Sequence, residues 1–306
     1  MGAGAVGGFY GALLARAGRQ VAFIARGAHL AAMRERGLTV EREGMPTIEL
    51  REVVAASSPA AIGPVDLVLF TPRSFDLEGA AASIAPLLRG DTLVLPLLNG
   101  LDIADRLAAV VGRDRVLAGL CQISSAIAAP GLIRQSGPLN RVVLGEMDGG
   151  PSVRAAAVAE LMQQAGINAH ASDNMAEELW KKFYFLDPWA GVCALTDSPL
   201  GPVREDPDTR AVLIECIEET RALAQASGVN LPTAAEALAT LEALPAESTP
   251  SLLRALRQGA PLEIDVVPGT AVRLGLKLGV PTPAHRLIYA GLKHRARGRD
   301  GDGRRR

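Results

Sequence analysis

Apolar residues in the first half of the chain, up to about residue 145, follow two alternating patterns. Short apolar runs are typical of strands buried in a parallel sheet, and segments with apolar residues every three or four positions are typical of amphipathic helices. The strand-like runs are 20–25, 38–40, 48–54, 66–70, 92–98 and 141–145, and the helical patterns between them include 77–88 and 103–111. This alternation predicts a parallel α/β sheet with helices on its faces.

The second half of the chain has helical spacing throughout. Helices are predicted at 152–164, 173–186, 209–227, 234–244, 251–258, 270–278 and 283–293. Pro188 should kink or end the helix in which it stands, because proline lacks the amide hydrogen. We therefore expect an α/β domain of Rossmann type over 1–168 and an all-α domain over 169–293. The cleft between two such domains is the usual place for a substrate.

A glycine-rich motif of the form G-x-G-x-x-G opens the chain, and a helical pattern follows it. Such a loop lets the backbone approach a pyrophosphate closely, while the helix N-terminus supplies unpaired N–H groups. Glycine-rich helix entries without a ligand are common, so the motif gains weight only from the strand-like run that follows. A strand normally precedes the motif, but Met1 adjoins the first glycine, so the first strand of the domain is expected to be missing. The predicted cofactor loop consists of Gly2, Ala3, Gly4, Ala5, Val6 and Gly7.

Three polar residues follow strand-like runs, where ligands of α/β sheets bind. Arg26 stands where an NAD-specific enzyme would carry an acidic residue, and its guanidinium could pair with the 2′-phosphate of NADP(H). The alternative is an exposed arginine that opens the next helix. Arg73 and Asn99 follow two further runs, although Asn99 could equally be a turn residue before Gly100.

Composition and charge exclude several classes of protein. The chain has 306 residues, 48% of them apolar, and a net charge of −1, which describes a soluble globular protein whose main partner is not nucleic acid. It has neither a signal-like start nor an apolar run of the roughly 18–20 residues that span a membrane, so we expect a cytoplasmic protein. Its size and class are compatible with a homodimer. The arginine- and glycine-rich tail, 294–306, should be disordered.

Cysteine and histidine give no sign of a metal site. The three cysteines lack metal-ligand spacing and are predicted to be small buried residues. They are Cys121, Cys193 and Cys216. The four histidines form no cluster along the chain.

Specific motifs in the helical half carry a resemblance to a known family. The stretch 173–185 contains Trp180-Lys181-Lys182, and Glu263 follows Ser251 by twelve residues. Together with the glycine loop and Asn99-Gly100, these resemble the ketopantoate reductase family, which reduces 2-dehydropantoate to pantoate with NADPH in pantothenate and coenzyme A biosynthesis. The resemblance runs from Gly2 to about Lys293.

The resemblance implies roles for individual residues. Lys182 would be the catalytic lysine, Ser251 would bind the substrate carboxylate, and Glu263 would contact the substrate hydroxyl and the cofactor. Asn99 would lie between nicotinamide and substrate, and Arg73 would bind the cofactor in place of a lysine that many members have. A lysine suits the reaction, because hydride transfer to a ketone leaves charge on oxygen that an ammonium can stabilise and then protonate. From the pattern alone, its neighbour in the Lys-Lys pair is nearly as good a candidate.

Two departures from the family pattern leave the substrate open. Asparagines that well-known members carry four and eight positions after the lysine are Leu186 and Ala190 here. A related NADPH-dependent reductase of another small 2-oxo acid is therefore an alternative.

Two further functions remain as alternatives. A non-catalytic NADP(H)-binding redox sensor would need the glycine loop and Arg26 but not the lysine, serine and glutamate. A hydroxy-acid dehydrogenase with a histidine–arginine pair is disfavoured, because His170 and His285 have no acidic partner that the sequence makes recognisable.

Overall fold

The computed structural model describes residues 1–298, and these divide into two compact units. The first unit comprises residues 1–98 and 102–175, and the second comprises 99–101 and the chain from 176 onward. The first unit contains strands and helices, and the second is helical. The predicted order of an α/β domain followed by an all-α domain is confirmed. The short stretch 99–101 leaves the first unit and returns to it, so the second unit is discontinuous in sequence.

The strands of the first unit form a mixed arrangement, whereas a parallel sheet was predicted. Strand order is β3-β2-β8-β7 with β9 beside β8, and two separate parallel pairs join β1 to β4 and β5 to β6. The strands are β1 (Ala22–Ile24), β2 (Leu38–Arg42), β3 (Met45–Leu50), β4 (Val54–Ala56), β5 (Leu67–Phe70), β6 (Leu93–Pro96), β7 (Ala118–Ala129), β8 (Leu132–Gly145) and β9 (Asn168–Ala171).

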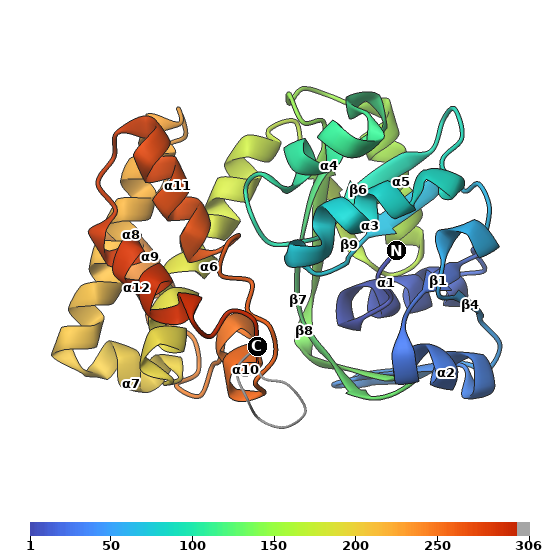
Figure 1. Cartoon of the computed structure of the whole chain (residues 1–306), viewed down its shortest axis with the longest axis horizontal. Helices are drawn as coiled ribbons and strands as arrows, with labels where there is room; N and C mark the ends of the chain where they lie inside the picture. The colour runs from blue at the N-terminus through green and yellow to red at the C-terminus, as the bar shows by residue number, and fades with distance from the viewer. Residues whose placement is uncertain (299–306) are drawn as a thin grey trace. The chain divides into compact units, whose positions relative to one another are not determined.

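Short turns with glycine explain the antiparallel pairs. The long strands β7 and β8 run side by side in Figure 1 and are joined by Pro130-Gly131, with Gly131 at φ +80°. Strands β2 and β3 are joined around Gly44 at φ +68°. A two-residue connection can link only antiparallel neighbours, whereas parallel strands need a long crossover. The apolar pattern of a strand does not reveal this difference.

Residues 1–3 are hydrogen-bonded to strand ends on both sides. The Met1 nitrogen donates to the Leu69 carbonyl (2.8 Å), and the Met1 carbonyl accepts from the Thr71 amide (2.9 Å). On the other side, the Ala3 amide donates to the Ile24 carbonyl (2.8 Å). Within residues 1–298 no strand precedes the first helix. These bonds set the glycine loop at the carboxyl ends of β1 and β5.

Helices cover the strands of the first unit. They are α1 (Ala5–Arg16), α2 (Gly27–Arg36), α3 (Leu77–Ser83), α4 (Ile103–Val111) and α5 (Val153–Gln164), with 3₁₀ turns η1 (Pro59–Ala61), η2 (Ser74–Asp76), η3 (Ala85–Leu87) and η4 (Arg113–Arg115). Helix α1 packs on β7 and β8 and buries Phe9 and Leu13 completely. Gly11 allows close packing of this helix, because a Cβ there would lie 2.5 Å from the Phe23 ring.

The second unit consists of seven helices in its described part. They are α6 (Met175–Thr196), which begins in the last residue of the first unit, α7 (Leu200–Glu205), α8 (Pro207–Ala226), α9 (Ala234–Glu242), α10 (Ser251–Arg257), α11 (Pro268–Leu278) and α12 (Pro283–Lys293). Helices α8, α11 and α12 contact one another (Figure 1). One core cluster centres on Trp180, Phe183 and Leu223, and Leu101 of the stretch 99–101 packs against it. Thr233 and Glu236 form a capping box at the start of α9.

The predicted helix end near Pro188 is wrong, because α6 continues through the proline to Thr196. Proline removes one hydrogen bond from the helix. The residues on both sides are well buried, with Tyr184 4% and Ala190 1% exposed. Packing of this segment therefore holds the helical conformation despite the missing bond.

Three further predictions concern burial and the chain end. Cys121, Cys193 and Cys216 are buried, as predicted. Residues 294–298 form hydrogen-bonded turns, and the Ala296 carbonyl accepts from the Leu262 amide; the remaining predicted tail, 299–306, lies outside the described residues. None of the described helices has the length and apolar character needed to cross a membrane.

Candidate functional site

The glycine loop, residues 2–7, is shaped by close backbone approaches. Gly2 has φ +84°, and a Cβ there would lie 2.7 Å from the Pro72 nitrogen. A Cβ on Gly7 would lie 2.3 Å from the Thr71 hydroxyl oxygen and 2.6 Å from the Gly2 carbonyl. At Gly4 the nearest atom to such a Cβ is 3.9 Å away, so this side of the loop is open. Two glycines thus fold the loop, and the third leaves space for a ligand.

The start of helix α1 is suited to bind an anion. Gly4 is the N-cap residue and provides no side chain to accept from the first amides, and the first turn carries no acidic residue. Helix geometry leaves the first N–H groups without intrahelical acceptors, and the helix dipole favours negative charge there. This arrangement fits the pyrophosphate of a dinucleotide.

Thr71 fixes the loop to the end of β5. Its hydroxyl lies 3.0 Å from the Met1 carbonyl and 2.8 Å from the Gly2 carbonyl, toward which it donates. The sequence showed a polar run after a buried strand but not this role. Two residues later, the exposed Arg73 is the N-cap residue of the turn η2. The predicted cofactor residue Arg73 is therefore carried by the segment that holds the loop.

Arg26 joins the same region from the end of β1. It is the N-cap residue of α2, its side chain is 75% exposed, and its guanidinium lies 3.7 Å from the carboxylate of Asp76. Asp76 ends the turn that Arg73 precedes. The glycine loop, Arg26 and Arg73 thus meet near the carboxyl ends of β1 and β5. Asp76 is a neighbour that the sequence analysis missed, since nothing along the chain pairs it with Arg26.

The structure separates the two adjacent lysines of helix α6. Lys181 is exposed and forms an ion pair of 2.6 Å with Glu177 one turn earlier. Lys182 is half-buried, and its ammonium nitrogen is out of contact with solvent. Lys181 is therefore the solvated lysine, as predicted.

The other predicted substrate-binding residues also fall in the second unit. Ser251 is the first residue of α10 and is exposed, and Glu263 is half-buried in the segment before α11. Asn99 is half-buried and belongs to the stretch 99–101. Lys182, Ser251 and Glu263 thus lie on three separate segments of one unit. The residues predicted to hold the cofactor phosphates lie in the other.

The expectation that His285 has no acidic partner is wrong. Its Nδ1 lies 2.5 Å from Glu219 Oε2 and its Nε2 lies 2.9 Å from Asp187 Oδ2. Burial alone would lower the pKa of His285, but the two carboxylates raise it to about 9. The sequence could not show this, because the three residues stand on different helices. With both ring nitrogens engaged and 1% exposure, His285 has no nitrogen for a substrate.

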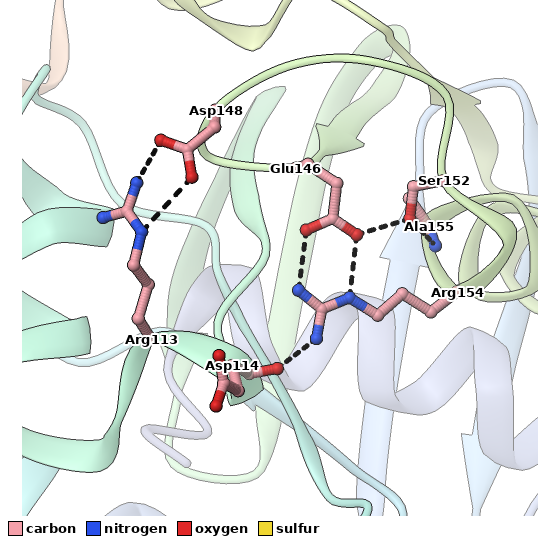
Figure 2. A network of polar contacts seen from close by, with 7 residues as sticks. All are labelled: Arg113, Asp114, Glu146, Asp148, Ser152, Arg154 and Ala155. Carbon is pink, nitrogen blue, oxygen red and sulfur yellow. Dashed lines mark hydrogen bonds and ion pairs between the residues drawn. The ribbon is translucent and has the colours of Figure 1, made fainter.

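A second polar network, drawn in Figure 2, lies just after the end of β8, away from the carboxyl ends of β5 and β6. Glu146, directly after β8, accepts two hydrogen bonds from Arg154 (2.8 and 2.6 Å) and one from Ser152 (2.5 Å), and Arg113 pairs with Asp148. The hydrogen bonds from Arg154 lower the pKa of Glu146. Strand β8 ends beside the start of β7, away from the ends of β5 and β6. We therefore interpret this network as a structural tie between β8 and α5.

Comparisons with known proteins find similar sequences and structures. A 2-dehydropantoate 2-reductase of Mesorhizobium japonicum is 31% identical over 94% of both chains. The crystal structure of a PanE/ApbA family ketopantoate reductase from Ralstonia eutropha is 35% identical over 97% of both chains, with a TM-score of 0.88. A D-mandelate dehydrogenase in complex with NADH and anilino(oxo)acetate shares the fold, with a TM-score of 0.87 at 24% identity over 96% of both chains.

Family models cover nearly the whole described chain. The model for ketopantoate reductase PanE/ApbA matches residues 1–149, and the model for the C-terminal part of the same family matches 174–296. The two matches correspond to the α/β part and the helical part of the structure. The chain therefore belongs to the ketopantoate reductase PanE/ApbA family of nicotinamide-dependent oxidoreductases.

Proposed function

We propose that the protein reduces 2-dehydropantoate to pantoate with NADPH, a step toward pantothenate and coenzyme A. The observation that carries the proposal is a half-buried lysine, Lys182, at the family position for the catalytic residue, in a chain whose glycine loop forms an open anion site. Several relatives are named 2-dehydropantoate 2-reductase, which supports the same substrate. A redox sensor would not require Lys182, Ser251 and Glu263 together.

The chain's own residues have separable tasks in this reaction. The bound nicotinamide cofactor would supply the hydride. The ammonium group of Lys182 stabilises the negative charge that develops on the ketone oxygen and then gives that oxygen its proton. Ser251 holds the substrate carboxylate, and Glu263 accepts from the hydroxyl. Asn99 orients the substrate toward the cofactor, which makes the two reacting groups neighbours.

Arg26 is proposed to select NADPH. Its exposed guanidinium stands at the end of β1, where a planar fork can bind the two oxygens of a 2′-phosphate. It lies 3.7 Å from Asp76, and an ion pair this exposed is weak enough to be exchanged for a phosphate. Arg73, near the same strand ends, is proposed as a second cofactor contact.

A second candidate is the reduction of another small 2-oxo acid. Leu186 is half-buried and Ala190 is 1% exposed, and both stand where asparagines would bind the hydroxyl and carboxylate ends of the substrate. An apolar wall discriminates weakly against a substrate without the hydroxyl, whereas a hydrogen-bonding wall discriminates strongly. These two residues therefore favour a broader or different 2-oxo acid.

Cofactor oxidation with a panel of 2-oxo acids tests the proposal. The loss of NADPH absorbance is followed with 2-dehydropantoate and with 2-oxo acids that differ in branching and in the terminal hydroxyl. We expect turnover with 2-dehydropantoate, and none with the Lys182→Ala variant. Higher kcat/KM for an acid without the hydroxyl would favour the second candidate. NADPH binding without reduction of any 2-oxo acid would refute both.

A further inference from the structure

A buried group of three charged side chains joins three helices of the second unit. Asp187 comes from α6, Glu219 from α8 and His285 from the first turn of α12, and their side chains are 0%, 10% and 1% exposed. Glu219 also accepts from the backbone amides of Ala284 (2.7 Å) and His285 (3.1 Å). It thereby satisfies amides at the start of α12 that have no intrahelical acceptor. We call these three residues the Asp–His–Glu triad.

The triad links the three helices because each imidazole nitrogen lies within ion-pair distance of a carboxylate oxygen. Nδ1 is hydrogen-bonded to Glu219 and Nε2 lies 2.9 Å from Asp187, so a protonated histidine places a positive charge between two negative ones. Removing one member of a buried ion pair strands the other charge away from water, which costs several kcal/mol. The position of Asp187 on α6 is therefore strongly coupled to α12 through the imidazole.

Asp187 stands at the weakest point of helix α6. Pro188 follows it and has no amide hydrogen, so the Tyr184 carbonyl lacks its usual helix donor. Kinks in helices form at such positions. Lys182 lies five residues before Asp187, about 7.5 Å along the helix axis at about 1.5 Å per residue. Any change of bend at the proline would move the turn that carries Lys182 relative to α8 and α12.

We propose that the Asp–His–Glu triad positions Lys182, by fixing helix α6 on the N-terminal side of its proline to helices α8 and α12. His285 and Asp187 are positioning residues and do not touch the substrate. The inference rests on the proposed function, since it assigns a role through Lys182. The family resemblance did not point to these residues, and they lie outside the proposed substrate contacts.

A variant that breaks the link without stranding a charge tests this role. Asp187→Leu combined with His285→Gln removes the bridge between α6 and α12, while Glu219 keeps its two backbone donors. We expect kcat to fall at least about tenfold, with the NADPH dissociation constant within about twofold of the wild-type value, because the cofactor-phosphate residues lie in the other unit. Hydrogen exchange of the α6 amides near Pro188 should become faster.

Two controls separate positioning from general damage. Asp187→Asn can still donate to a neutral imidazole through its amide, so it should keep kcat within about threefold of wild type. His294→Gln changes an exposed histidine just after α12 and should alter nothing. Asp187→Leu alone, which leaves His285 paired with Glu219, replaces the double variant if that variant does not fold.

The possible outcomes are distinct. If the wild type reduces no 2-oxo acid, the proposed function fails and this inference fails with it. If the wild type is active and the folded link-breaking variant keeps kcat within about twofold, only the positioning role is overturned. Loss of folding in both link-breaking variants, or an Asp187→Asn variant as impaired as the double variant, would also overturn it.

Discussion

The charge on His285 predicts a specific dependence of stability on pH. Asp187 and Glu219 raise its pKa from the ordinary 6.5 to about 9 in the folded protein, against the opposing effect of burial. The folded state therefore binds a proton that the unfolded state releases between these two values. At about 1.4 kcal/mol per pKa unit, the protonated histidine contributes about 3 kcal/mol to the stability of the second unit. This contribution is fully present below pH 6.5 and is lost as the pH rises through about 9.

Tryptophan fluorescence can measure this contribution in the second unit alone. The chain has two tryptophans, Trp180 and Trp189, and both lie on α6. Urea unfolding is followed by this signal between about pH 6 and about pH 10. Glu219 stays ionised over this whole range, because His285 and two backbone amides lower its pKa against the effect of burial. With a urea dependence of about 1–3 kcal/mol per molar, the midpoint should fall by roughly 1–3 M over this range.

His285→Gln should remove most of this slope, because glutamine does not titrate. The variant should be less stable than wild type below pH 6.5, and the two should converge at high pH. His294→Gln should keep the wild-type slope. A His285→Gln variant with the same slope as wild type, or a wild type whose stability rises between pH 6.5 and 9, would refute a charged histidine in this position.

Three substitutions test the proposed catalytic and cofactor sites. Lys182→Ala should abolish turnover and leave NADPH affinity, measured by fluorescence titration, within about twofold of the wild-type value. Lys181→Ala should change neither turnover nor affinity. Normal turnover in the Lys182→Ala variant would exclude the lysine mechanism. Arg26→Ala should raise the dissociation constant of NADPH about tenfold and hardly affect NADH, and equal losses for both cofactors would contradict a 2′-phosphate contact. Gly7→Ala should weaken cofactor binding and lower the unfolding temperature, since its Cβ would overlap neighbouring atoms. Gly79→Ala in α3 meets no atom within 4 Å and should stabilise the protein by about 0.5–1 kcal/mol. If calorimetry showed a stability change of the same sign for both variants, this would count against the close packing of the glycine loop on Thr71.

Local patterns in the sequence were sufficient for the fold class and most helices. The helix predicted at 283–293 is found as α12 with the same bounds, and the glycine loop begins helix α1 as expected. The direction of strands was not predictable in the same way. A strand buried on one or both faces looks alike whether its neighbour is parallel or antiparallel, and Pro130-Gly131 was not recognised as a hairpin turn.

Contacts between distant residues account for what the sequence analysis missed at the site. Thr71 and Asp76 hold the glycine loop and Arg26, and each makes its contact across tens of residues along the chain. His285 was judged by its sequence neighbours, yet its partners stand on α6 and α8. Pro188 was expected to kink or end its helix, because local propensity cannot include the burial that holds α6 together.

The stretch 99–101 limits how this protein can be divided for experiments. Leu101 packs against the core cluster of Trp180 and Phe183, although it is encoded between β6 and α4. A fragment that starts at residue 176 would lack this side chain and leave a partly open core. The helical unit therefore cannot be exchanged between homologues as a single contiguous cassette. A domain chimera would have to carry the donor's residues 99–101 together with its C-terminal half.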